Sequence, residues 1–269
     1  MKLRPLALEV LCLADPAAKA DAARALQARV AALPAEAVDV ETAPRPDPAV
    51  ALPGRPALPR LVPPAEVARR SAFDAEGRAA LLHSIAHIEF NAINLAADCA
   101  WRFDGMPRDF YLDWVRIMAE EAQHFTLLAE LLQTMGRRYG DFPAHDGLWA
   151  MCEKTAGDVV ARLALVPRTL EARGLDATPQ IQARLRRVDT DDARRAVEIL
   201  DLILRDEIGH VAAGNRWYRW ACAQRGLDPL AQYRLLARRH GAPRLRPPFN
   251  LAARREAGFS EEEIARLGE

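Results

Sequence analysis

Two Glu-x-x-His motifs are the residues of this sequence best suited to chemistry. Glu121 and His124 form the first motif, and Glu207 and His210 form the second. Residues three apart on a helix lie on one face, so the carboxylate and imidazole of each motif can reach the same metal ion. One such motif arises easily by chance in a helical protein, whereas two, each in a long helical pattern, are much more specific. The pair therefore predicts a metal site.

The glutamate of each motif lies in the middle of an apolar stripe, which should face the protein core. Around Glu121 the stripe consists of Phe110, Trp114, Ile117, Met118, Phe125, Leu128 and Leu132. Around Glu207 it consists of Ala196, Leu200, Ile203, Leu204, Val211 and Gly214. A buried carboxylate without a partner is costly, so these groups need one. A metal ion would supply it; the alternative is a Glu–His or Glu–Arg pair that serves structure alone.

A third carboxylate, Glu89, follows from the same reasoning. Its helix face carries Leu82, Ile85, Ala86, Ala92, Ile93, Ala96 and Ala100. The segment Asp-Gly-Met-Pro at 104–107 is a strong turn signal, and Glu89 precedes Gly105 by the same sequence distance at which Glu121 follows it. In an antiparallel hairpin each would lie about 24 Å from the turn, at about 1.5 Å per residue. We therefore expect the two carboxylates to lie side by side.

The fourth carboxylate is Glu171 or Glu153. The sequence separation between Glu171 and Glu207 is close to the separation between Glu89 and Glu121. Glu153 lies much farther from Glu207 along the chain and would require an asymmetric hairpin. The spacing favours Glu171 and leaves Glu153 open.

Four long helical patterns would position these residues. They cover about 74–103, 108–135, 148–173 and 191–225. No sustained two-residue alternation of apolar and polar side chains indicates a strand, so the sequence predicts an all-α fold with a four-helix bundle over 74–226. The third pattern is the least regular, because Pro167 should kink it and because Gly174 and Pro179 interrupt the segment after it.

Three further segments flank this bundle. They are an N-terminal helical segment (1–33), a proline-rich arm (34–73) and a helical or extended tail (227–269). In the first, helix over 4–33 is predicted, with Asp15 as N-cap and Pro16 as first helical residue. Nine of the 19 prolines lie within 34–64, a density that excludes regular helix, and we expect the arm to lie along the bundle surface. The tail should hold a short helix near 260–267, with a Ser-x-x-Glu capping box.

Charge and cysteine patterns bear on the partners. The 37 basic and 37 acidic residues cancel, so overall charge gives no reason to expect nucleic acid or an anionic membrane as the main partner. The four cysteines form no Cys-x-x-Cys pair, which argues against a thiolate zinc site and a disulfide scaffold. There is no run of about 18 apolar residues and no secretory leader pattern. We expect a cytoplasmic protein with no membrane partner.

The histidines of the first bundle helix suggest a second site only weakly. His83 and His87 point away from Glu89. The polar stripe nearly opposite Glu89 is His87, Asn91, Asn94 and Asp98. We expect this stripe to be solvated, or hydrogen-bonded beneath the arm.

The amino-acid sequence around the motifs resembles that of a known family. The resembling segments are His-Ile-Glu-Phe-Asn-Ala-Ile-Asn at 87–94, Glu-Glu-Ala-Gln-His at 120–124, Leu-Glu-Ala-Arg-Gly at 170–174 and Arg-Asp-Glu-Ile-Gly-His at 205–210. They look like a bacterial ferritin-like family labelled only as a domain of unknown function, over about residues 55–255. That family lies within the ferritin-like di-iron carboxylate superfamily and is distantly similar to tRNA-modifying di-iron hydroxylases.

The resemblance implies a ferritin-like bundle and a ligand set. The metal ligands would be Glu89, Glu121, His124, Glu171, Glu207 and His210. In the superfamily arrangement Glu121 and Glu207 would bridge two ions, and Glu89 and Glu171 would be terminal. Such a carboxylate-rich set suits two ions of iron, of manganese or of both, rather than zinc. O2 would be the co-substrate.

These inferences lead to one function and three alternatives. We expect a di-iron oxidoreductase, an O2-dependent oxidase or hydroxylase of a small organic molecule. The alternatives are a ferroxidase or iron-handling protein, a non-catalytic metal-stabilised binding protein, and a tRNA-modifying hydroxylase. For the last, the arginines within 184–195 and 234–246 would be the contacts. The sequence is compatible with a homodimer.

Overall fold

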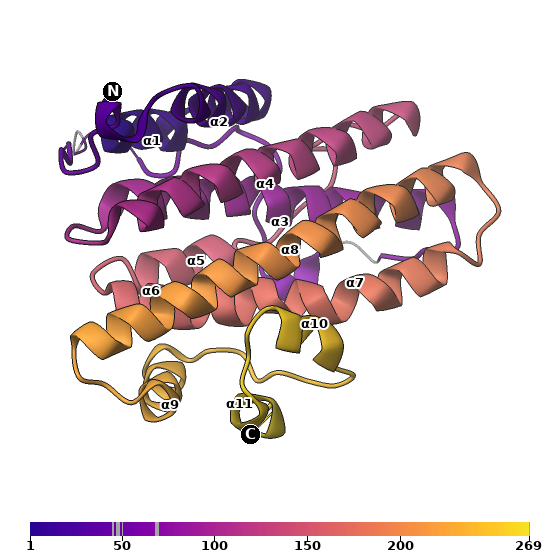
Figure 1. Ribbon diagram of the computed structural model, residues 1–269. Helices are drawn as coiled ribbons and strands as arrows, with labels where there is room; N and C mark the ends of the chain where they lie inside the picture. The colour runs from indigo at the N-terminus through magenta and orange to yellow at the C-terminus, as the bar shows by residue number, and fades with distance from the viewer. Residues whose placement is uncertain (45, 47–48, 50, 68–69, 269) are drawn as a thin grey trace. The chain divides into compact units, whose positions relative to one another are not determined.

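The computed structural model of the chain is all-α, as the sequence predicts (Figure 1). It describes residues 1–268 except 45, 47–48, 50 and 68–69, so those positions of the predicted arm, and residue 269 of the predicted tail, lie outside the described residues. The chain divides into two compact units, Met1–Trp149 and Ala150–Glu269. Over the described residues, no helix is both long and apolar enough to cross a membrane.

A helical hairpin of α3 (Ala75–Arg102) and α4 (Arg108–Thr134) forms the centre of the first unit. These bounds lie close to the predicted 74–103 and 108–135. Asp74 caps the start of α3, where its side chain accepts a hydrogen bond from Gly77 N at 2.7 Å. Gly105 makes the connecting turn at φ 70°, a left-handed conformation that favours glycine. The hairpin thus brings the middles of α3 and α4 to the same height.

Two N-terminal helices pack on this hairpin. Helix α1 (Leu3–Cys12) contacts α3, and α2 (Pro16–Ala31) contacts α4 (Figure 1). The prediction of helix over 4–33 is therefore correct for most of α1 and α2, and Asp15 is the N-cap of α2, but the chain is not one continuous helix. Asp15 accepts a hydrogen bond from Ala18 N at 2.8 Å, and this cap starts a new helix.

The described part of the proline-rich arm contains only the short 3-10 helices η1 (Ala35–Ala37) and η2 (Pro64–Glu66). It lies against the first unit through backbone hydrogen bonds, among them Gly54 N to Leu11 O at 2.8 Å and Val62 N to Ala144 O at 2.8 Å. A Cβ added at Gly54 would lie 2.0 Å from the carbonyl oxygen of Cys12, so this close approach requires glycine.

In the second unit, the predicted third helix over 148–173 is wrong. The chain instead forms α5 (Gly147–Lys154), α6 (Val159–Leu165), the π-helix η3 (Val166–Glu171) and α7 (Ala172–Leu185). Asp158 caps α6, accepting a hydrogen bond from Val160 N at 3.0 Å, and so restarts the helix after a turn. Pro167 gives a π-helix rather than a simple kink.

Gly174 and Pro179 do not interrupt the chain as predicted, because both lie inside α7. Pro179 has no N–H to donate to the carbonyl oxygen of Leu175, four residues earlier. Asn250 compensates, since its side-chain nitrogen donates to Leu175 O at 3.2 Å. A side chain from the tail therefore lets α7 continue to Leu185.

The long helix α8 (Asp191–Gln224) packs against α6, η3 and α7 and matches the predicted fourth helix, 191–225. The C-terminal helices of this unit are α9 (Pro229–His240), α10 (Leu251–Glu256) and α11 (Glu261–Ala265). As predicted, the last of them begins with a capping box, formed by Ser260 and Glu263.

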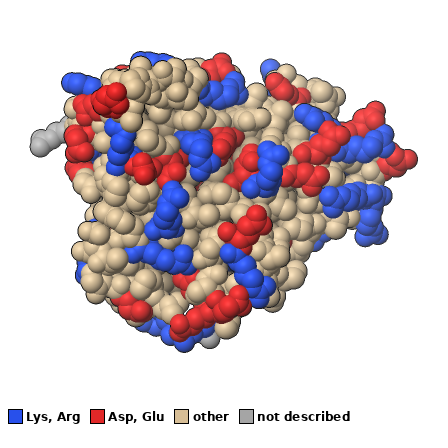
Figure 2. Space-filling view, in the orientation of Figure 1, with Lys and Arg blue, Asp and Glu red and all other residues tan. Residues whose placement is uncertain are grey.

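Charged side chains of both signs are mixed over the face seen in Figure 2. The arginine cluster within 184–195 follows this pattern. Arg194 pairs with Asp191 at 2.6 Å, and Arg195 pairs with Glu198 at 2.8 Å. These pairs are exposed and neutralise part of the cluster, so it does not form a uniformly basic surface.

Candidate metal centre

Glu89, Glu121 and His124 lie together inside the first unit. His124 Nδ1 is 3.1 Å from Glu89 Oε2 and 3.3 Å from Glu121 Oε2. Their ligand atoms all lie within 4.8 Å of one another, and each side chain is buried. The hairpin therefore places Glu89 beside Glu121, as expected from their equal distances from the turn.

The surroundings of this group are apolar on both helices. On α4, Phe110, Trp114 and Met118 have no exposed surface. On α3, the helix face that carries Glu89 includes several buried alanines. They are Ala86, Ala92, Ala96 and Ala100. Two carboxylates in such a layer are stable when a positive partner compensates them or when one of them binds a proton.

The pKa of Glu89 shows that its ionised form is unfavourable in the metal-free site. Burial raises the pKa of Glu89, and the neighbouring Glu121 carboxylate raises it further, to about 8, although contact with His124 lowers it. One imidazole thus does not compensate two buried carboxylates. A cation bound between them would, because it stabilises the ionised form of both.

The donor set and its spacing fit a metal ion. Ligand atoms at about 2.1 Å from an octahedral ion, at right angles, lie about 3 Å apart. The two contacts of His124 Nδ1, at 3.1 and 3.3 Å, are close to this spacing. Two carboxylate oxygens and one imidazole nitrogen suit iron or manganese. The residues present therefore fit a cation of this class.

The other three predicted ligands lie in the second unit. Glu207 and His210 are buried on α8, with His210 Nδ1 4.0 Å from Glu207 Oε2. Glu171 is buried at the end of η3. Among the described residues, Glu171 does not form a group with Glu207 and His210 in which all ligand atoms lie within 4.8 Å. Glu153, the alternative to Glu171, is exposed on α5.

A close helix contact positions η3 against α8. A Cβ added at Gly214 would lie 2.8 Å from Pro167 Cβ, so only glycine permits this approach. The extra residue in a π-helical turn also rotates the following side chains, by about 100° at 3.6 residues per turn. In the sequence, Pro167 was the only signal of the π-helix. It indicated a kink in the helix but not the direction in which the following side chains turn.

The polar stripe on α3 is not solvated. His87, Asn91, Asn94 and Asp98 are all buried. His87 Nδ1 is 2.9 Å from the Tyr139 hydroxyl, and Asn94 Oδ1 accepts a hydrogen bond from Lys19. The predicted alternative, hydrogen bonding, is therefore correct, but these two partners lie on α2 and in the segment after α4 rather than on the arm. Burial lowers the pKa of His87 to about 3, so its ring is neutral at physiological pH.

Comparison with known protein families shows which family the chain belongs to. One family profile, described as a protein of unknown function, DUF455, matches residues 12–265. The chain belongs to the DUF455 family. The DUF455 match extends beyond the roughly 55–255 of the resemblance and contains all six candidate ligands.

An uncharacterized protein of Haemophilus influenzae is similar to this DUF455 chain. It is 48% identical over 217 residues, which are 78% of this chain and 74% of that protein. No solved structure matches the chain.

Proposed function

We propose that this DUF455 protein is a ferritin-like di-metal protein that uses O2 to oxidise a small organic substrate. The observation that carries the proposal is the buried contact of His124 with both Glu89 and Glu121. Here two carboxylates share one imidazole in an apolar layer, an arrangement that favours a bound cation.

The proposed second half of the site consists of Glu171, Glu207 and His210. Each of them is buried, and the two motifs have the same residue types at the same spacing. Four carboxylates and two imidazoles would give a ligand charge of about −4, which balances two divalent ions. As the superfamily resemblance implies, we propose that these six residues would supply the ligands for two metal ions.

Iron is the proposed metal, and manganese or a mixed pair would use the same ligands. The bound metals would supply the electrons that reduce O2 and the oxidising power that acts on the substrate. The protein contributes position and environment. Ile117, Met118 and Phe125, each within about one turn of Glu121 on α4, are buried and apolar. Such surroundings exclude water and strengthen electrostatic interactions.

Two rival functions make different predictions about iron. A ferroxidase or iron-handling protein would accumulate many iron ions in a large assembly. A non-catalytic metal-stabilised binding protein would hold metal without any reaction with O2. Both share the ligand set of the proposed oxidase or hydroxylase, so reactivity and stoichiometry must separate the three.

The test is anaerobic loading with Fe(II), followed by O2, monitored by ultraviolet–visible absorbance and by iron analysis. An oxidase or hydroxylase should show an O2-dependent absorbance change at about two irons per chain, the stoichiometry of a binuclear site. Iron that rises far above this value would favour iron storage. Bound iron without any response to O2 would overturn the oxidase proposal.

One observation keeps tRNA as a second substrate class. Between Pro229 and Arg255 the sequence has seven arginines and no acidic residue. Arg234, Arg238 and Arg239 of α9 are exposed. An electrophoretic shift with bulk tRNA that weakens steeply with added salt would support this alternative. The absence of a shift at low salt would eliminate it.

A further inference from the structure

The π-helix η3 is held by a buried ion pair from the C-terminal end of the chain. Arg168 lies within η3 and is only 4% exposed. Its Nη2 donates to Glu263 Oε1 at 2.5 Å, although the two residues are 95 positions apart. Glu171 is only three residues from Arg168 along the chain, but the ion pair of Arg168 is with Glu263.

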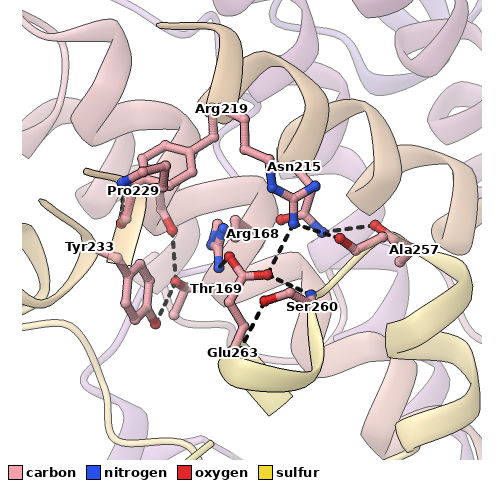
Figure 3. A network of polar contacts seen from close by, with 12 residues as sticks. Arg168, Thr169, Asn215, Arg219, Pro229, Tyr233, Ala257, Ser260 and Glu263 are labelled. Carbon is pink, nitrogen blue, oxygen red and sulfur yellow. Dashed lines mark hydrogen bonds and ion pairs between the residues drawn. The ribbon is translucent and has the colours of Figure 1, made fainter. Parts of the chain in front are cut away.

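The carboxylate of Glu263 accepts hydrogen bonds from three donors. Figure 3 shows it between Arg168 and Arg219, beside the backbone of Ser260. Arg219 Nη2 donates to Glu263 Oε2 at 2.9 Å, and Ser260 N donates to the same oxygen at 2.7 Å. Because Ser260 is the N-cap of α11, this carboxylate both starts the last helix and joins it to η3 and α8.

An aromatic cage surrounds the Arg168 guanidinium. The rings of Tyr218, Tyr233 and Phe259 lie 4.9, 5.2 and 5.1 Å from its carbon. Cation–π contacts of this kind stabilise an arginine that has few hydrogen-bond acceptors. Arg168 Nε and Nη1 indeed have no hydrogen-bond partner among the described residues. The position of the guanidinium therefore depends strongly on Glu263.

The next residue of η3 is held in the same way. The Thr169 hydroxyl donates to Ala164 O at 2.8 Å, so the Tyr233 hydroxyl, 3.1 Å away, must donate to it. Tyr233 belongs to α9 and Glu263 to α11. Side chains of two C-terminal helices thus bind Arg168 and Thr169, consecutive residues of the π-helix that lie shortly before Glu171.

We propose that α11 is a latch for the metal site, with Arg168 and Glu263 as the positioning pair that fixes Glu171. The inference rests on the proposed function, in which Glu171 is a ligand. Opening the latch would free η3 to relax toward a regular helix, which would rotate Glu171 away from its place. Movement of the C-terminal helices would then control occupancy of the second metal position.

The test compares Glu263→Gln with Glu261→Gln. Glu261 is on the same helix and forms an exposed pair with Arg255 at 2.7 Å, so its variant is a matched control. Hydrogen exchange of peptide 166–171 is measured in the metal-free protein, and Mn2+ binding is measured by titration. E263Q should exchange about tenfold faster and bind one of two Mn2+ ions about tenfold more weakly, because breaking a buried pair is costly. E261Q should match the wild type.

The outcomes separate the latch from the proposed function. Unchanged exchange in E263Q, or faster exchange with unchanged Mn2+ affinity, would overturn the latch. A wild type that binds no Mn2+ would overturn the proposed function instead, and with it the role of Glu171. If E263Q does not fold, Arg168→Lys, which keeps the charge but loses the planar fork, should show a smaller change of the same kind. The absence of any change in R168K would then contradict the latch.

Discussion

His124 Nδ1 lies 3.1 Å from Glu89 Oε2, although the two residues are 35 positions apart in sequence. This contact joins α3 to α4 at the height where Glu121 also enters, 3.3 Å from the same nitrogen. It is a costly arrangement for a protein without metal, because two carboxylates compete for one imidazole.

Glu89→Gln should stabilise the metal-free protein at pH 8 by about 1 kcal/mol, because it removes a buried charge beside Glu121. Asp98 is the matched control on the same helix, since it is buried but paired with Arg102 at 2.7 Å. Asp98→Asn should lower the free energy of unfolding by about 1–3 kcal/mol. Chemical denaturation with chelator present measures both. Equal destabilisation by the two variants would indicate that Glu89 is a structural partner of His124.

Gly214→Ala should destabilise the second unit, because the added Cβ would lie 2.8 Å from the rigid ring of Pro167. Overpacking of this kind costs about 1–3 kcal/mol. Gly209, on the same helix, has nothing within 4 Å of an added Cβ. Gly209→Ala should instead stabilise by up to about 1 kcal/mol, through helix propensity. Thermal unfolding would distinguish them, and a neutral Gly214→Ala would contradict the close contact between α8 and η3.

Lys19 should give the protein a stability that rises with pH above neutrality. Burial lowers the pKa of Lys19 to about 7, and its ammonium group is held by Leu11 O and Gly54 O at 3.2 and 2.9 Å. Between about pH 7 and the unfolded value near 10.5, the unfolded chain binds more protons, so the free energy of unfolding increases with pH. The limiting slope is about 1.4 kcal/mol per pH unit.

Lys19→Met provides the comparison for this pH dependence. The variant should lose the rise between pH 7 and 10, and it should be less stable at pH 10 because the acceptors on Leu11, Gly54 and Asn94 lose their donor. Denaturation midpoints at several pH values measure the difference. A wild-type profile that is flat over this range, or identical in the variant, would show that the amine remains fully protonated when buried.

The first half of the candidate site was predictable from the sequence because it depends on regular geometry. A symmetric hairpin about Gly105 and a three-residue spacing place Glu89, Glu121 and His124 at one height, and both quantities can be counted along the chain. Helices α3 and α4 have no proline or buried turn that would disturb this count. The proximity of these three side chains therefore followed from their spacing and from the apolar stripes around them.

The second half depends on contacts that no local pattern encodes. Pro179 looked like a helix breaker, yet Asn250, distant in sequence, satisfies the carbonyl that it leaves free. Pro167 indicated a kink, but Gly214 and Glu263 decide the form that it takes. Helix was predicted on both sides of Asp15, which was recognised as a cap, but the end of α1 at Cys12 was not. Long-range contacts account for the differences at Pro167 and Pro179, whereas the break at Asp15 is local.

The most direct test of the metal site is the metal content of the wild type and of Glu121→Gln and Glu120→Gln, after expression with iron and manganese. Glu120 is the neighbouring carboxylate, but it faces Arg116 at 2.6 Å and is partly exposed. The wild type and E120Q should each retain about two metal ions per chain, as a binuclear carboxylate site would, and E121Q should lose most of both. A wild type without bound metal, or an E121Q protein with as much metal as the wild type, would contradict the proposed centre.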